Sequence, residues 1–452
     1  MLIQTSYQID NPIHRNGTGR QQINHLVIHH YNIMKKWVWI YFILLIFEGA
    51  LRKWLLPGLS TPLLIIRDPV ALGLLFMAWK WRILPSNKMM ITVMIIGVVS
   101  VFTAFYIGHG NLAVALFGAR IFIFHFPLIF IIGKVFSYQD VLKLGKICLW
   151  LSIPMTLLIA LQFYSPQSAW INRGIGGDIK GGGFTGALGY FRPPGTFSFT
   201  TGVSQFYSLT GVYIIFFWFN RSSVNRLILI IATLCLLAAI PLSISRGLFF
   251  SVVVSLLFSA VILMRKPKFL LQSIVAIVLL GYLIYFLGNS NAFQNINEVF
   301  TARFTTANKL EGGAKGLFVD RYLGGMVGAL STSADEPFFG YGSGMGTNVG
   351  AILITGKQVF LIAEGEWGRL IGELGLLMGL LIIIFRLVIS EQLALKAYRE
   401  IKYGNILPWM LISFALLNIP QGQWAQPTSL GFSIIIGGLV LASINKHPLD
   451  KW

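Results

Sequence analysis

Three carboxylates and an arginine lie close together at the start of a long apolar stretch. They are Glu364, Glu366, Arg369 and Glu373. The last three are spaced three and four residues apart, so on a helix they share one face. Charge inside a membrane is costly and usually functional. Glu364 or Glu366 could take a proton from an attacking hydroxyl as a general base. The alternative is that Arg369 only pairs with its two helical neighbours.

The segment before this predicted helix is polar, rich in glycine and too irregular to lie in lipid. It runs from Asp320-Arg321 to the turn Pro337-Phe338-Phe339-Gly340-Tyr341-Gly342-Ser343-Gly344. Together with the carboxylates, this polar segment indicates an active site at the outer face of the membrane that the protein spans, with Arg321 as a catalytic residue. Tyr341 and Trp367 could form flat platforms for sugars, and Arg369 could contact the substrate. The alternative for the aromatic residues is an interfacial belt.

The composition indicates a polytopic membrane protein. Of the 452 residues, 55% are hydrophobic and only 11% are charged, whereas a soluble domain has about a quarter charged residues. We predict an all-α fold of about twelve transmembrane helices, because one span takes roughly 17–25 apolar residues. The predicted spans are 37–56, 62–79, 89–107, 112–133, 141–163, 197–219, 226–244, 247–264, 268–287, 359–385, 405–420 and 427–444.

The basic residues predict the orientation. The formal net charge is +19, and the lysines and arginines lie mainly in alternate short loops, which the positive-inside rule places in the cytoplasm. This explains the charge better than nucleic-acid binding does, so we expect membrane lipids and no nucleic acid as partners. Both termini are then cytoplasmic. The predicted segments are a polar tail 1–34, helices one to nine in 35–287, a large periplasmic loop 288–358, and helices ten to twelve with a short tail in 359–452.

Several arginines lie at the predicted outer ends of helices. Arg192, Arg246, Arg303 and Arg321 occupy glycine- and proline-rich turns or the large loop. The guanidinium of one arginine can donate two parallel hydrogen bonds to phosphate oxygens, and it does not lose its proton. These four residues therefore predict a cationic cavity that opens outward. For arginines nearer the helices, such as Arg52 and Arg67, the alternative is that they reach the lipid headgroups and pair locally.

Four motifs follow one another along the chain. They are Arg192-Pro193-Pro194-Gly195-Thr196-Phe197, Ser243-Ile244-Ser245-Arg246-Gly247, Arg321 with the turn at 337–344, and Glu364-Gly365 leading to Glu373-Leu374-Gly375-Leu376. In this order, with a large loop after the ninth predicted helix, the chain resembles the O-antigen ligase and O-antigen polymerase superfamily. These are membrane glycosyltransferases of the GT-C type. The resemblance covers residues 110–440 approximately.

The resemblance implies an activity, a substrate and roles for particular residues. The substrate would be an undecaprenyl-diphosphate-linked oligosaccharide, polymerised at the outer face of a bacterial inner membrane without a cofactor or metal. A flippase and a chain-length regulator would be partners. Arg192 and Arg246 match arginines at the outer mouth, and Arg321 matches the arginine before the proline–glycine turn. Glu364 stands where ligases of this family have a histidine. The alternatives are a ligase and, from another class, a secondary transporter of an anionic solute.

The position of Glu364 gives a test. Glu364→Gln keeps the size of the side chain but removes the base, so elongation of a synthetic lipid-diphosphate glycan should fall about 10²–10⁴-fold. Activity of the unmodified protein should fall as the pH drops through the pKa of that carboxylate. Glu366→Gln is the comparison, because Glu366 should face Arg369. Near-normal elongation by Glu364→Gln would move the base to Glu366 or remove the need for one.

Overall fold

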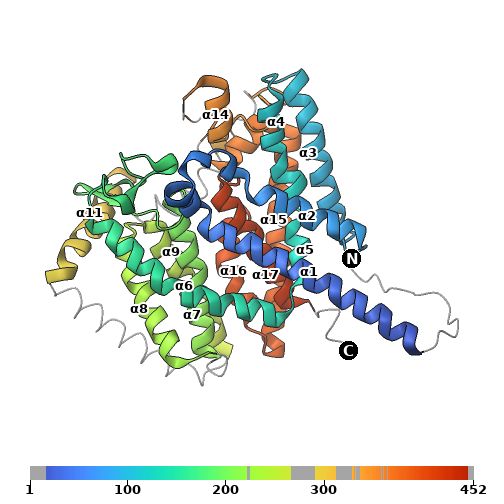
Figure 1. Cartoon of the computed structure of the whole chain (residues 1–452), viewed down its shortest axis with the longest axis horizontal. Helices are drawn as coiled ribbons and strands as arrows, with labels where there is room; N and C mark the ends of the chain where they lie inside the picture. Colours follow the sequence, from blue (N-terminus) through green and yellow to red (C-terminus); the bar gives the residue numbers. More distant parts are fainter. Residues whose placement is uncertain are drawn as a thin grey trace.

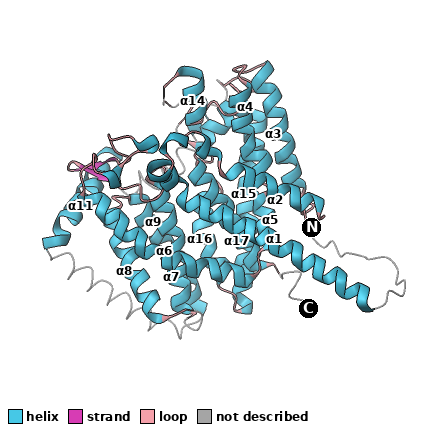
Figure 2. Cartoon of the chain, in the orientation of Figure 1, coloured by secondary structure: helices cyan, strands magenta, loops and turns pink. Residues whose placement is uncertain are grey.

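The computed structural model describes residues 17–220, 224–265, 291–311, 328–329, 331, 336–357, 359, 361–363 and 365–445. The described chain is mostly helical, as predicted (Figure 2). Its first half contains the helices α1 (Gly17–Ala50), α2 (Arg67–Lys80), α3 (Lys88–Tyr106), α4 (Leu112–Arg120), α5 (Leu128–Val135) and α6 (Tyr138–Tyr164). A short hairpin of β1 (Phe184–Ala187) and β2 (Tyr190–Arg192) follows.

The second half continues the helical pattern. It contains α7 (Thr201–Phe219), α8 (Arg226–Leu242), α9 (Arg246–Arg265), α11 (Asn291–Glu311), α14 (Asn348–Thr355), α15 (Glu366–Glu400), α16 (Leu407–Asn418) and α17 (Pro427–Ile444). The predicted span 268–287 lies outside the described residues, as do parts of the predicted loop 288–358 and of the tail 1–34.

Within the described ranges, eight helical stretches are long and apolar enough to cross a membrane. They are Pro62–Lys80, Lys88–Tyr106, Leu112–Val135, Tyr138–Tyr164, Thr201–Phe219, Arg246–Met264, Glu366–Tyr403 and Pro427–Ile444. Two shorter apolar helices, Arg226–Leu242 and Leu407–Asn418, coincide with predicted spans. Apolar side chains such as Ile95, Phe102 and Leu157 are exposed on the outer faces of α3 and α6. Such faces are suited to lipid, as a multi-pass membrane protein requires.

The centre of the bundle is formed by α16 and α17. Both lie between α6–α9 on one side and α2–α5 on the other (Figure 1). Of the residues of α17, 83% are buried, and the helix packs on α5, α16 and α7. The glycine pair Gly437-Gly438 allows this close approach, because a Cβ at either position would press on Ile129 or Ile132 of α5. In Figure 1, α14 lies at the top, whereas the hairpin and α11 lie at the left, where α11 packs on α8 and β1.

Two predicted spans contain wide, π-helical turns instead of continuous α-helix. One follows α1 at Leu51–Leu55, and the other separates α4 from α5 at Ile121–His125. Such turns shift side chains relative to a regular helix and are frequent at functional sites. Here they carry buried polar groups. Arg52 and Lys53 lie on the first turn, and His125 lies on the second.

The predicted span 359–385 falls on α15, which is long and apolar enough to cross a membrane but is not one straight helix. Gly375 inside α15 has φ 78° and ψ 170°, which breaks the helix. On a continuous helix, Glu366 and Arg386 would lie roughly 30 Å apart at 1.5 Å per residue. Instead, Arg386 Nη1 lies 2.7 Å from Glu366 Oε1. The two parts of α15 therefore fold back on one another at Gly375, and only the part after the break continues to the other end of the bundle.

The glycine-rich turn at 337–344 fills this break. The backbone N–H of Tyr341 donates to the Gly372 carbonyl over 2.7 Å, and that of Gly342 donates to the Glu373 carbonyl over 3.1 Å. Gly344 packs against Gly118 of α4. The carbonyl groups that the break releases thus find donors, as polar backbone inside an apolar bundle requires. The spacing of glycines in this motif reflects close backbone packing.

The break predicts a sharp difference between two glycines of the same segment. Gly375→Ala puts a Cβ onto the Phe338 carbonyl in a left-handed conformation, and backbone strain of this kind alone costs about 1–3 kcal/mol. Gly365→Ala meets nothing within 4 Å and is the matched control. Thermal unfolding in detergent should show a lowered midpoint for Gly375→Ala only. Equal midpoints for the two variants would contradict the fold-back at Gly375.

Candidate anion-binding site

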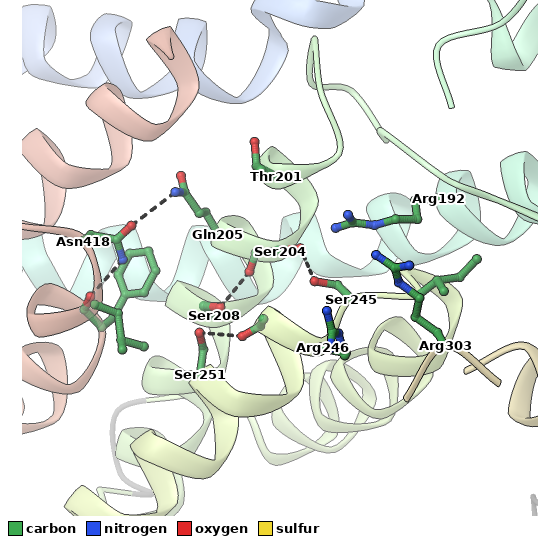
Figure 3. Close-up of a pocket in the computed structure, with 14 residues that line it drawn as sticks. Arg192, Thr201, Ser204, Gln205, Ser208, Ser245, Arg246, Ser251, Arg303 and Asn418 are labelled. Atoms are coloured by element: carbon green, nitrogen blue, oxygen red, sulfur yellow. Dashed lines mark hydrogen bonds between the residues drawn. The ribbon is translucent and has the colours of Figure 1, made fainter. Parts of the chain in front are cut away.

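A polar pocket of about 410 Å³ lies where β2 and α11 meet the N-terminal ends of α7 and α9. It lies between α7, α9 and α16 (Figure 3). Its lining consists of Arg192, Thr201, Ser204, Gln205, Ser208, Ile244, Ser245, Arg246, Gly247, Ser251, Arg303, Phe414, Leu417 and Asn418. Three of the arginines that the sequence singles out therefore meet, although β2, α9 and α11 lie far apart along the chain.

Arg192 is positioned by the segment that joins β2 to α7. Gly195, three residues further on, has φ +58°, and both of its backbone polar groups make hydrogen bonds to other segments. The Gly195 N–H donates to Gln162 Oε1 of α6 over 2.8 Å, and Lys53 Nζ donates to the Gly195 carbonyl over 2.5 Å. Thr196 donates to the Ile46 carbonyl of α1. The Arg-Pro-Pro-Gly-Thr motif thus fixes the end of the hairpin against α1 and α6.

Arg246 is positioned by a tight turn between α8 and α9. Ile244 in this turn has φ +48°, a strained conformation for a β-branched residue. Strain of this kind persists only where the surroundings hold it and is common at functional sites. Ser245 accepts hydrogen bonds from the N–H of Leu248 and from the Ser204 hydroxyl, at 3.3 and 2.7 Å. Arg246 therefore occupies the first turn of α9.

Arg303 completes the cationic side from α11, which packs on α8 and β1. The N-terminal ends of α7 and α9 also face this region, through Thr201 and Arg246. Helix N-termini carry partial positive charge and favour anions. Among the described residues that line the pocket, none carries a carboxylate. Guanidinium groups, helix ends and hydroxyls together form a site suited to phosphate oxygens.

The neutral side of the pocket was not predicted. Thr201, Ser204, Gln205 and Ser208 form one stripe on α7 at helical spacing. Across from them stands Asn418 of α16. The signal in the sequence was the polar spacing of three and four inside a predicted span, where uncharged polar residues must find partners.

The carboxylates Glu366 and Glu373 lie elsewhere, in a closed network with Arg369. Arg369 donates to both oxygens of Glu366 at 3.0 and 2.9 Å, and to Glu373 Oε2 at 2.6 Å. Glu366 is 4% exposed and Glu373 is fully buried. This is the pairing that the three-and-four spacing left open as an alternative. Glu366 and Arg369 do not line the pocket.

Arg386, which was not predicted as a site residue, joins this network from the part of α15 that follows the break at Gly375. It donates to Glu366 and to the carbonyls of Ile419 and Gly422. Its guanidinium lies 3.9 Å from the centre of the Trp424 ring. The backbone N–H of Trp424 donates to Glu366 Oε2 over 3.1 Å. The network therefore fixes the connection between α16 and α17 to α15.

The remaining predicted residues have separate places. Trp367 is buried, and its indole donates to the Pro420 carbonyl. Tyr341 is partly exposed beside the fold-back of α15. Neither lines the pocket. Arg321 and Glu364 lie outside the described residues.

A second buried network occupies the other half of the bundle. Asp68 accepts from Arg120 at 2.7 and 2.9 Å and bonds His125 Nε2 at 2.9 Å, while Tyr41 bonds His125 Nδ1. Arg52 donates to Glu48 of α1 and to Ser198 of the segment before α7. Arg67 donates to the Pro427 carbonyl at the start of α17. Arg52 thus pairs locally with Glu48, four residues away, as one part of the alternative considered from the sequence had it. Arg52 and Arg67 are also buried and bind distant segments, so they do not reach outward to lipid headgroups.

No known protein-family model matches the chain, and no curated protein matches it. The resemblance to the O-antigen ligase and polymerase superfamily therefore rests on the motifs alone.

The network around Glu366 predicts a structural effect for its replacement. Glu366→Gln leaves Arg369 and Arg386 with one negative charge fewer between them, and breaking a buried ion pair costs about 3–5 kcal/mol. The thermal midpoint in detergent should fall clearly. Glu391→Gln, at an exposed position on the same helix, is the control and should not change it. An unchanged midpoint for Glu366→Gln would mean that this pairing does not hold the fold. For the test of Glu364, Glu391→Gln is thus the better comparison.

Proposed function

We propose that the chain is a membrane glycosyltransferase that polymerises glycan repeat units carried on undecaprenyl diphosphate. The observation that carries the proposal is the convergence of Arg192, Arg246 and Arg303 in one pocket at the end of a membrane bundle. A diphosphate attached to a lipid reaches an enzyme at the membrane surface, where this pocket opens. The order of sequence motifs supports the same class.

The reaction would use the pocket to hold the leaving group. A hydroxyl of the acceptor sugar attacks the anomeric carbon of the donor, and a new glycosidic C–O bond forms. The bond from that carbon to the diphosphate oxygen breaks, and the diphosphate leaves with the electron pair. Arginines stabilise the charge that grows on the leaving oxygen. The proton of the attacking hydroxyl passes to a base, for which Glu364 is the candidate.

The setting of the reaction follows from the charge of the loops. We place the enzyme in a bacterial inner membrane with both termini in the cytoplasm and the pocket facing the periplasm. Lipid-linked repeat units made inside the cell must first cross the membrane, so a flippase would supply the substrate. A chain-length regulator is a further proposed partner. A ligase would use the same pocket and differ only in the acceptor.

A secondary transporter of an anionic solute is the second candidate, because transporters bind substrates at broken helices. The helix break at Gly375 favours it. However, the carbonyls released there already accept from Tyr341 and Gly342, and Glu373 beside the break is bound to Arg369. The break is thus filled by the protein itself, and the cationic pocket lies between other helices. The enzyme is the better supported function.

Replacing one arginine tests the proposal. Arg246→Lys keeps the charge but loses the planar pair of donors, which is worth about 1.5–3 kcal/mol for a charged hydrogen bond. Elongation of undecaprenyl-diphosphate oligosaccharide in proteoliposomes should fall roughly 10–150-fold. Arg226→Lys, at the opposite end of the bundle beside Trp218 and Val224, is the control and should elongate normally.

Elongation at the unmodified rate by Arg246→Lys would remove the pocket from the reaction. Uptake of an anionic solute without any elongation would favour the transporter. Transfer of a single glycan without growth of the chain would favour the ligase.

A further inference from the structure

The pocket has two chemically different sides. In Figure 3 the guanidinium groups of Arg192, Arg246 and Arg303 lie together, and Gln205 and Asn418 lie across from them. A diphosphate needs only the cationic side. The neutral side therefore needs a separate explanation.

The hydroxyl groups of three pocket serines already donate their hydrogens to other groups of the protein. Ser208 donates to the Ser204 carbonyl over 2.7 Å, and Ser204 donates to the Ser245 oxygen over 2.7 Å. Ser251 donates to the Gly247 carbonyl over 2.9 Å. A hydroxyl has one hydrogen and two lone pairs. What these serines still offer to a ligand is acceptor capacity.

The orientation of the two amides is fixed by a backbone carbonyl. Asn418 bonds the Phe414 carbonyl over 2.9 Å, and a carbonyl can only accept. The nitrogen of Asn418 must therefore point there, and its oxygen must face Gln205. It follows that Gln205 approaches Asn418 with its nitrogen, over 3.2 Å. The same nitrogen donates to the Ser429 hydroxyl over 3.1 Å.

Both amide hydrogens of Gln205 are thus engaged, while its Oε1 is buried and has no hydrogen-bond partner in the described part of the chain. An unmatched buried acceptor destabilises the fold, and native proteins rarely keep one without a reason. A ligand that donates a hydrogen bond would satisfy it. The ligand should therefore carry an anion at one end and hydroxyl donors at the other.

We infer that the neutral side of the pocket is a glycosyl subsite, in which Gln205 Oε1 accepts a hydrogen bond from a hydroxyl of the sugar attached to the diphosphate. Gln205 would be a specificity-determining residue, positioned by Asn418 and Ser429. This inference rests on the proposed function, since it names the part of the lipid-linked substrate that the cationic side does not bind. Phosphate oxygens are acceptors and cannot fill this role, so the subsite distinguishes a glycosylated diphosphate from a bare one.

The test compares bare and glycosylated lipid diphosphates on two variants of Gln205. Binding of undecaprenyl diphosphate, and of a panel of undecaprenyl-diphosphate monosaccharides, is measured on the full-length protein in nanodiscs. Gln205→Met keeps the length of the side chain and removes the acceptor. It should weaken the best monosaccharide ligand about 5–100-fold and leave bare undecaprenyl diphosphate within twofold. Gln205→Leu is the second variant, and unchanged binding of the bare diphosphate shows that either variant is folded.

Arg246→Gln is the matched control from the cationic side, because it should weaken both kinds of ligand equally. The subsite would be overturned if no monosaccharide ligand bound the unmodified protein more tightly than the bare lipid. Equal weakening of both ligands by Gln205→Met and Gln205→Leu would also overturn it, as would no weakening of either. Failure of the proposed function looks different, since the unmodified protein would then bind glycosylated lipid with the Gln205 dependence intact but would not elongate it.

Discussion

The cost of burying charge inside an apolar bundle governs how this protein is assembled. A charge there must be paired, because a bare charge in hydrocarbon costs several kcal/mol. Glu366 is the clearest case, since it accepts from Arg369 and Arg386 and from the Trp424 backbone at once. These partners belong to three different stretches of chain. Pairing the charge therefore also fixes the two parts of α15 and the α16–α17 connection relative to each other, at the same end of the bundle as the pocket.

Several residues with irregular backbone conformations lie at the end of the bundle that carries the pocket. Gly375 breaks α15, Gly195 bends the segment before α7, and Ile244 holds a strained turn before α9. Regular helices alone could not bring Arg192 and Arg246 together, because each stands at the end of an element whose direction the irregular residue sets. At the first two of these sites, neighbouring segments satisfy the polar backbone groups that the irregular residue exposes: Tyr341 and Gly342 do so at Gly375, and Gln162 and Lys53 at Gly195. The position of Arg192 in the pocket thus depends on hydrogen bonds that Gln162 and Lys53 make to the segment after it.

The sequence could predict what depends on local spacing. The apolar runs predicted most of the described membrane helices, and the spacing of Glu366, Arg369 and Glu373 predicted that they could pair. The predicted positions of Arg192 and Arg246 at helix ends also indicated that these two residues could share a cavity. The sequence could not predict the role of Arg386, because Arg386 reaches Glu366 only through the fold-back at Gly375. A glycine in an apolar run does not reveal that the chain reverses there. Nor could it predict the partners of Lys53 and Arg67, which are backbone carbonyls of remote segments.

The composition of the pocket separates binding from proton transfer. Its described lining offers guanidinium groups, hydroxyls and amides, and none of these is a general base near neutral pH. Such a lining can hold a diphosphate and orient the sugar attached to it, which are tasks that a polymerase and a ligase share. The base and the binding surface for the acceptor would then come from outside this lining, and Glu364 precedes the helix that Arg369 and Arg386 hold in place. Polymerase and ligase would accordingly differ in the acceptor side of the site, while the donor pocket could remain the same.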